Sequence, residues 1–187
     1  MKKTTTILIG VFVIILLIAG YFISSYNGIV AAEEEVDAQF AKVETQLQRR
    51  FDLIPNLVSA TQGYMQHEKD VFTAIADARS KLAGATTVND KVEASNELEG
   101  ALSRLLMVVE NYPELKADTQ FTALMDELAG TENRIATERN RYNESVQTFN
   151  AKIRKFPTSF IASIMGVEKR DYFEAQAGAD QAPSVNF

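Results

Sequence analysis

The feature that most constrains this chain is an apolar stretch near its start, residues 4–23, TTTILIGVFVIILLIAGYFI. From Ile7 to Ile23 it holds no charged or strongly polar side chain. At ~1.5 Å per helical residue, about 20 residues span the ~30 Å hydrocarbon core of a bilayer. Because no water is present there to bond the backbone, such a segment must be helical. The sequence therefore predicts one transmembrane helix that anchors everything after it.

A cleaved signal peptide is the alternative interpretation, since Lys2 and Lys3 form a basic start and residues 30–32 resemble a cleavage site. The apolar run exceeds the ~7 to 15 residues of a signal core, which favours a retained anchor. The first charges after the span are the acidic residues 33–35, and the first basic residue is Lys42. This asymmetry predicts a cytoplasmic N-terminus and an extracytoplasmic bulk.

Composition narrows the classes of partner. Of 19 basic and 25 acidic side chains, only Lys2 and Lys3 precede residue 33, so the remainder has 17 basic and 25 acidic groups, a net charge of −8. Such a surface repels phosphate backbones and anionic headgroups over roughly 8 Å, and we expect no nucleic-acid partner. The chain has no cysteine, which excludes disulfides, a thiol nucleophile and a thiolate metal site.

Beyond a polar joint at residues 24–28, apolar residues recur at spacings of three and four, as in helices with one apolar face. Four such stretches cover about residues 29–62, 66–82, 88–110 and 118–156. Short turns and the matched lengths of the first and fourth predict an all-α fold. After the N-terminal transmembrane helix, we expect an up-and-down antiparallel four-helix bundle with long first and fourth helices.

Local signals give the helix limits. Pro55 should kink the first helix without ending it, and Gly63 should end it. Thr87 is expected to cap the third helix, and Pro157 to end the fourth. The predicted domains are the anchor and joint at 1–28, the bundle at 29–157, and a membrane-proximal apolar turn and tail at 158–187.

The fourth helix carries an apolar residue at every seventh position: Phe121, Leu128, Ile135, Tyr142, Phe149 and Phe156. This repeat predicts coiled-coil-like packing against a neighbour. The seam beside it holds Glu132 and Arg139 where a core would have leucine, which predicts a shielded polar layer whose partners lie within the fourth helix or on the first. We expect this structural layer to comprise Arg49, Asp52, Asn56, Glu132, Arg139 and Asn143. Its alternative role is ligand binding or acid/base chemistry.

The segment after Pro157 is apolar and has no evident place in the bundle. We expect it to contact another copy of the chain or the membrane, through Phe160, Ile161, Ile164, Met165, Tyr172, Phe173 and Phe187. The alternative is that it folds back on its own bundle. Anchoring confines the molecules to two dimensions, which favours a homo-oligomer.

Several motifs give the chain a family resemblance. These are Tyr26-Asn27, Arg49 to Val58, His67-Glu68, Ala78-Arg79, Glu110 to Lys116, Thr131 to Ala136, Arg139 to Asn143 and Phe156-Pro157. With the N-terminal anchor, their order resembles the LemA family over nearly the whole chain. The resemblance implies a bacterial, single-pass membrane protein with a helical bundle, no assigned enzymatic activity and an envelope role. We therefore expect the chain in the bacterial inner membrane.

The sequence offers no catalytic, cofactor-binding or metal site. His67 is the only histidine, and Glu68 beside it points to a different helix face, which favours a surface residue. Phosphate loops, nucleophile elbows and zinc-protease motifs are absent. The sequence therefore predicts a membrane-anchored, non-enzymatic scaffold or assembly protein of the cell envelope. The alternative is an adaptor or sensor that presents its bundle or tail to a membrane protease or another envelope protein.

Overall fold

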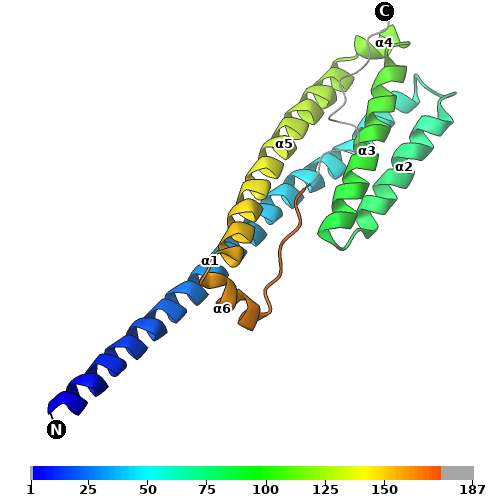
Figure 1. Cartoon of the computed structure of the whole chain (residues 1–187). Coiled ribbons are helices and arrows are strands. Elements are labelled where there is room, and N and C mark those ends of the chain that lie inside the picture. Colours follow the sequence, from blue (N-terminus) through cyan, green and yellow to red (C-terminus); the bar gives the residue numbers. More distant parts are fainter. Residues whose placement is uncertain (1, 174–187) are drawn as a thin grey trace, which may run out of the picture. The chain divides into compact units, whose positions relative to one another are not determined.

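The computed structural model describes residues 2–173, and every regular element in that range is an α-helix (Figure 1). The helices are α1 (Lys2–Gln62), α2 (Lys69–Gly84), α3 (Val88–Val109), α4 (Pro113–Lys116), α5 (Thr119–Arg154) and α6 (Thr158–Met165). The predicted all-α class is confirmed. As far as they are described, residues 2–39 and 142–170 form a first compact unit, and residues 40–141 and 171–173 form a second. The predicted domain limits at residues 28 and 157 stay a prediction.

α1 is one uninterrupted helix of 61 residues, so the polar joint expected at residues 24–28 is wrong. None of these residues is a proline. A glycine inside a helix lowers its stability by only about 1 kcal/mol relative to alanine, which is too little to interrupt a helix of this length. The carbonyl of Gly28 also accepts a hydrogen bond from the Lys152 ammonium. Pro55 lies inside α1 without ending it, and the helix stops at Gln62, both as predicted.

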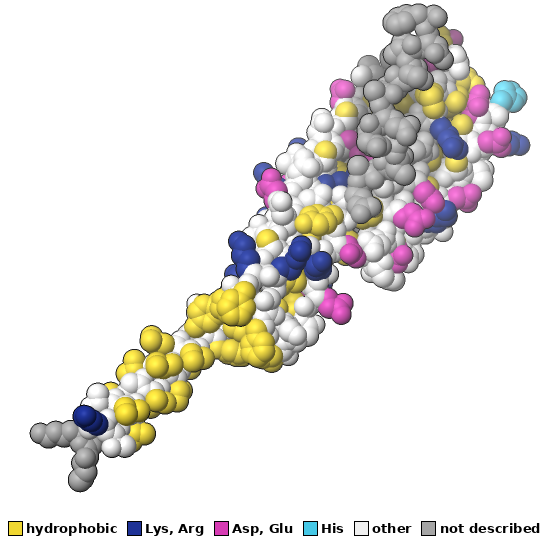
Figure 2. Space-filling view, in the orientation of Figure 1, with side chains coloured by type: hydrophobic (Ala, Val, Ile, Leu, Met, Phe, Trp, Pro, Cys, Tyr) yellow, Lys and Arg dark blue, Asp and Glu magenta, His cyan; other side chains and the backbone are white. Residues whose placement is uncertain are grey.

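The N-terminal part of α1 is long and apolar enough to cross a membrane, by length and composition. None of its most apolar window is buried. Figure 2 shows hydrophobic side chains on all visible sides of this segment. A helix that is apolar all round and uncovered by protein is a candidate for burial in lipid.

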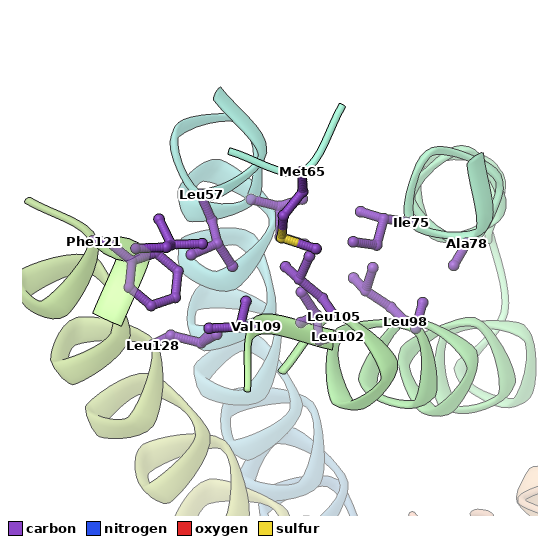
Figure 3. Close-up of a cluster of buried hydrophobic side chains, with 13 residues drawn as sticks. Leu57, Met65, Ile75, Ala78, Leu98, Leu102, Leu105, Val109, Phe121 and Leu128 are labelled. Atoms are coloured by element: carbon purple, nitrogen blue, oxygen red, sulfur yellow. The ribbon is translucent and has the colours of Figure 1, made fainter. Parts of the chain in front are cut away.

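The second unit is built around a hydrophobic cluster to which α1, α2, α3, α4 and α5 all contribute (Figure 3). α3 supplies Leu98, Leu102, Leu105 and Val109, whose spacing puts them on one helix face. Burying one such leucine contributes about 1.5 to 3 kcal/mol. Met65 and Leu115, from the short segments between the long helices, are fully buried in the same cluster.

The helix ends in this unit follow local signals. Thr87 caps α3 as predicted, in a reciprocal arrangement in which its side chain accepts from the Asp90 N–H and Asp90 accepts from the Thr87 N–H. α2 starts at Lys69 because residues 61–68 turn back on themselves through backbone hydrogen bonds. α4, which the sequence did not predict, starts at Pro113, whose fixed φ suits a first helical position.

The first unit packs the part of α1 that follows the candidate span against the end of α5 and α6. Ile29, Val36, Phe149 and Ile161 are buried in it. The seven-residue repeat is buried from Phe121 to Phe149, but its last predicted member, Phe156, is 87% exposed. The reason is that α5 ends at Arg154, so Phe156 lies beyond the helix that would have turned it inward.

The segment predicted as an apolar turn is the eight-residue helix α6. It ends at Gly166, whose φ of 68° is the left-handed conformation that glycine adopts without strain. The Val167 N–H then donates to the Ala162 carbonyl at 3.1 Å, which satisfies one of the last carbonyls of α6.

Candidate functional site

The most distinctive polar group of the second unit centres on Arg50 in α1, which is 0% exposed. Its Nη1 donates to both Glu132 carboxylate oxygens on α5, at 3.2 and 3.3 Å. Its Nη2 donates to the Ser95 carbonyl at 3.3 Å and to the Ser95 hydroxyl on α3. One buried guanidinium therefore joins three helices through charged and polar contacts.

A second guanidinium converges on the same serine. Arg139 Nη2 donates to Ser95 Oγ at 2.8 Å, and its Nη1 lies 3.8 Å from a Glu99 carboxylate oxygen. Ser95 and Glu99 are four residues apart on α3, which places them on one face of that helix. The Arg139 guanidinium also lies 4.3 Å from the centre of the Phe173 ring, a cation–π contact with the chain beyond α6.

The electrostatics of this group are set by two cations sharing one hydroxyl. Burial lowers the pKa of Arg139 from its ordinary value, and the neighbouring Arg50 lowers it further, while Glu99 and Glu132 oppose the shift. The Nε atoms of Arg50 and Arg139 are buried and make no hydrogen bond within residues 2–173. Arginine stays protonated in proteins, so these groups can hold and position anionic or polar partners but cannot serve as bases.

The residues predicted for the polar layer are distributed differently. Arg49 faces outward and pairs with Glu127 at 2.8 Å, with side chains 45% and 44% exposed. Asp52 and Asn56 are exposed, and Gln48 donates to Asp52. Glu132 and Arg139 are half-buried and paired as described above, while Asn143 belongs to the first unit. Their partners are thus Arg50 and α3, and not Arg49, Asp52 or Asn56.

Arg50 and Ser95 are the central members that the predicted layer lacked. A sequence signal for Arg50 exists, because the buried positions Val43, Leu47, Arg50, Ile54 and Leu57 alternate spacings of four and three. Arg50 thus occupies the apolar stripe of α1, and Arg49, one residue earlier, is rotated by about 100° away from it. Ser95 carries a comparable signal, because it continues the buried stripe of α3 at alternating spacings of three and four up to Val109.

A cavity of about 370 Å³ lies elsewhere in the second unit, between α1 and the segment that joins α2 to α3. It is lined by Glu44, Leu47, Gln48, Phe51, Leu82, Ala83, Ala85 and Lys91. Glu44 and Lys91 pair with one another across it, and the Lys91 ammonium lies 5.5 Å from the Phe40 ring centre. Its charged groups are therefore already partnered.

His67, the histidine that the sequence predicts to be a surface residue, is exposed.

The residues predicted to contact another copy or the membrane separate into two sets. Phe160 and Ile164 are 66% and 61% exposed on one face of α6, and Tyr172 is also exposed. Ile161 and Phe173 are buried within the chain itself, and Met165 is half-buried. Phe187 lies outside the described residues. The exposed set remains available for a contact, whereas the buried set is occupied.

Comparison with known proteins identifies relatives of this chain. A sequence profile of the LemA family matches residues 39–187. Magnetosome protein MamQ 2 of Paramagnetospirillum magneticum is 29% identical over 181 residues, which cover 83% of this chain and 66% of that protein. MamQ of Magnetospirillum gryphiswaldense is 27% identical over the same shares, so the chain spans just under two thirds of these relatives. Protein LemA of Metamycoplasma hominis is 23% identical over 82% of this chain and 71% of its own length. This chain belongs to the LemA family.

Proposed function

We propose that this protein is a membrane-anchored, non-enzymatic scaffold of the bacterial cell envelope. The observation that carries the proposal is the continuity of α1. This single helix holds the candidate span at its start and contributes Ile54 and Leu57 to the helical core near its end. A continuous helix of this kind suits a protein that holds position at a membrane.

The relatives also support a role at a membrane. Family membership and the names of the MamQ proteins, which are magnetosome proteins, favour a membrane-associated role. We propose the inner membrane, with the N-terminus cytoplasmic and the helical core outside, on the basis of the Lys2/Lys3 flank and the acidic residues 33–35.

We further propose that the helical core is an up-and-down four-helix bundle. The long helices would be α1 and α5, which contact each other through Arg49–Glu127 and Arg50–Glu132. In this account the group of Arg50, Ser95, Glu132 and Arg139 fixes the alignment of α1, α3 and α5 and performs no chemistry. Its charges bond to one another, as is typical of a structural polar layer.

The scaffold is proposed to be a homo-oligomer. Tethering raises the effective concentration of neighbouring copies, and the exposed Tyr172 offers uncovered apolar surface. The test is the mass of the full-length chain in nanodiscs, measured by mass photometry. We expect several copies per particle, and fewer when residues 171–187 are deleted, with unchanged helical content by circular dichroism. A monomeric particle of the intact chain would refute the oligomer.

The alternative function is an adaptor or sensor for a membrane protease or another envelope protein. What favours it is the seating of the chain after α6, where Asn89 donates to Asp171 at 3.2 Å and Arg139 stacks on Phe173. A segment held this way could be released to a partner. Affinity capture of the anchored chain distinguishes the two, since a scaffold recovers mainly itself and an adaptor recovers one second protein in a fixed ratio.

A further inference from the structure

α6 lies at the edge of the candidate membrane span. Its first residue, Thr158, accepts a hydrogen bond from Ser25 at 3.2 Å, and its hydroxyl lies 3.4 Å from that of Tyr21. Tyr21 is inside the apolar stretch of α1, and Ser25 is two residues, or ~3 Å, beyond its end. If α1 crosses a bilayer, α6 must therefore start at the boundary between hydrocarbon and headgroups.

The outward face of α6 is suited to that boundary. Phe160 and Ile164 are four residues apart and form an exposed apolar ridge, while Ile161 and Ala162 on the opposite face are buried against the first unit. Phe156, just before α6, is also exposed, as are Tyr21 and Tyr26 on α1. Aromatic side chains gather at both interfaces of membrane proteins. In Figure 2 the hydrophobic surface of the N-terminal segment continues over α6.

Positively charged side chains lie close to the start of α6. Two contacts tie this part of the chain to α1: Lys152 donates to the Gly28 carbonyl, and Ser25 donates to Thr158. Arg154 and Lys155 lie between these contacts in sequence, so they lie beside residues 25–28 of α1. Both side chains are exposed, and neither forms an ion pair within the described part of the chain. Figure 2 shows Lys and Arg side chains next to the hydrophobic surface of this region.

The nearest negative charges on α1, residues 33–35, lie further out from the span, and the first of them is paired. Glu33 is ten residues, or ~15 Å, beyond the end of the apolar stretch, which exceeds the ~8 Å screening length at physiological salt. Arg170 pairs with Glu33 at 2.8 Å and with Asp37 at 3.5 Å. Residues 151–170 carry five basic side chains and one acidic side chain, Glu168, so this end of the chain is positive although the net charge after residue 32 is −8.

We propose that α6 is an interfacial helix that inserts Phe160 and Ile164 into the headgroup boundary, and that Arg154 and Lys155 bind anionic phospholipid headgroups there. This rests on the membrane anchoring in the proposed function and adds a second, lipid-selective contact to it. Basic side chains beside an anionic membrane each favour binding by roughly fivefold. The exposed surface of α6 is thus assigned to lipid, and not to a second copy of the chain.

The test uses the absence of tryptophan from this sequence. Phe160→Trp in the full chain, reconstituted in nanodiscs, provides a single fluorophore on the α6 ridge. Met107→Trp, an exposed position on α3 in the second unit, is the matched control. We expect brominated lipid to quench the fluorophore on α6 strongly and the control little. At equal mole fraction, brominated phosphatidylglycerol should quench the fluorophore on α6 several-fold more than brominated phosphatidylcholine.

The charge contribution is tested in the Phe160→Trp background. Arg154→Gln with Lys155→Gln should abolish the preference for phosphatidylglycerol, while Lys81→Gln with Lys116→Gln, two lysines of the second unit, should preserve it. Solvent-like, unquenched emission from the fluorophore on α6 would overturn the inference. Equal quenching by both lipids would overturn the headgroup assignment. Emission typical of a buried tryptophan that no lipid quenches would assign the ridge to a second copy. In each case, retention of the chain in the nanodisc reports separately on the anchor.

Discussion

Each unit buries a large polar side chain, Arg50 in the second and Asn150 in the first, and the two side chains are bonded in different ways. In the second unit, Arg50 is 0% exposed and is bonded by side chains and a carbonyl from two other helices, Glu132 on α5 and Ser95 on α3. In the first unit, Asn150 is 8% exposed and bonds only to backbone, donating to the Arg170 carbonyl and accepting from the Arg170 N–H, both at 2.9 Å. The first arrangement fixes helices relative to one another, and the second fixes the chain that follows α6.

The two arrangements differ in what is left behind when a contact is broken. Breaking a charged contact in the second unit leaves an uncompensated charge in a hydrophobic core, which is costly. Breaking the amide contact in the first unit leaves neutral backbone groups that can turn to water once the segment loosens. The second unit should therefore respond to mutation with lost stability, and the first with increased local motion.

The largest expected effect comes from Glu132→Ala. It leaves the Arg50 guanidinium buried with only Ser95 as partner, so we expect a loss of about 3 kcal/mol, at the lower end for buried pairs because Glu132 is 33% exposed. At roughly 2 to 4 °C per kcal/mol, the melting temperature should fall by about 6 to 12 °C, measured by circular dichroism. The control is Arg49→Ala, whose exposed pair is worth ~0 to 1 kcal/mol. Equal effects of the two variants would show that the Arg50 group is not shielded.

An intermediate effect is expected from Asn150→Ala. Two hydrogen bonds to the Arg170 backbone are lost, at a cost of about 1 to 3 kcal/mol. Hydrogen exchange should accelerate at residues 166–170, while peptides from α3 stay protected. Asn56→Ala, an exposed asparagine of α1 in the second unit, is the control. If exchange rises equally in α3, the two units do not respond independently and the comparison fails.

The smallest effect is expected from Thr87→Ala, which removes one half of the capping box of α3. Loss of an N-cap typically costs ~1 kcal/mol, so the melting temperature should fall by a few degrees. Thr137→Ala serves as the comparison, because its exposed hydroxyl bonds only to the Asn133 carbonyl within α5. A loss at Thr137 that matches the loss at Thr87 would mean that the cap contributes nothing specific.

Local sequence signals predicted most of the fold. Thr87 marks a helix start by its own side-chain chemistry, and the seven-residue repeat from Phe121 to Phe149 marks a buried face. Errors arose where the signal was weak. Phe156 continues the repeat in sequence, but the helix ends first. Residues 24–28 are polar but contain no helix breaker strong enough to interrupt α1.

The polar layer was harder to predict, because which of two adjacent arginines is buried depends on a difference of one position in the helix. Arg49 and Arg50 are identical in type, and only the ~100° rotation between them sends one outward and the other into the core. The role of Ser95 depends on two arginines from other helices reaching it, which local sequence does not encode. Likewise, the positive membrane-facing end emerges only when Arg154 and Lys155 are placed beside α1.

The proposed function requires that α1 is retained as a membrane anchor with the helical core outside the cytoplasm. The most direct measurement is protease accessibility of the full-length chain in spheroplasts, with mass spectrometry of its N-terminus. We predict that the chain fractionates with membranes, keeps residues 4–23, and is degraded by external protease. A soluble product lacking these residues would contradict the anchor, and an intact membrane-bound chain that is fully protected from protease would reverse the proposed orientation.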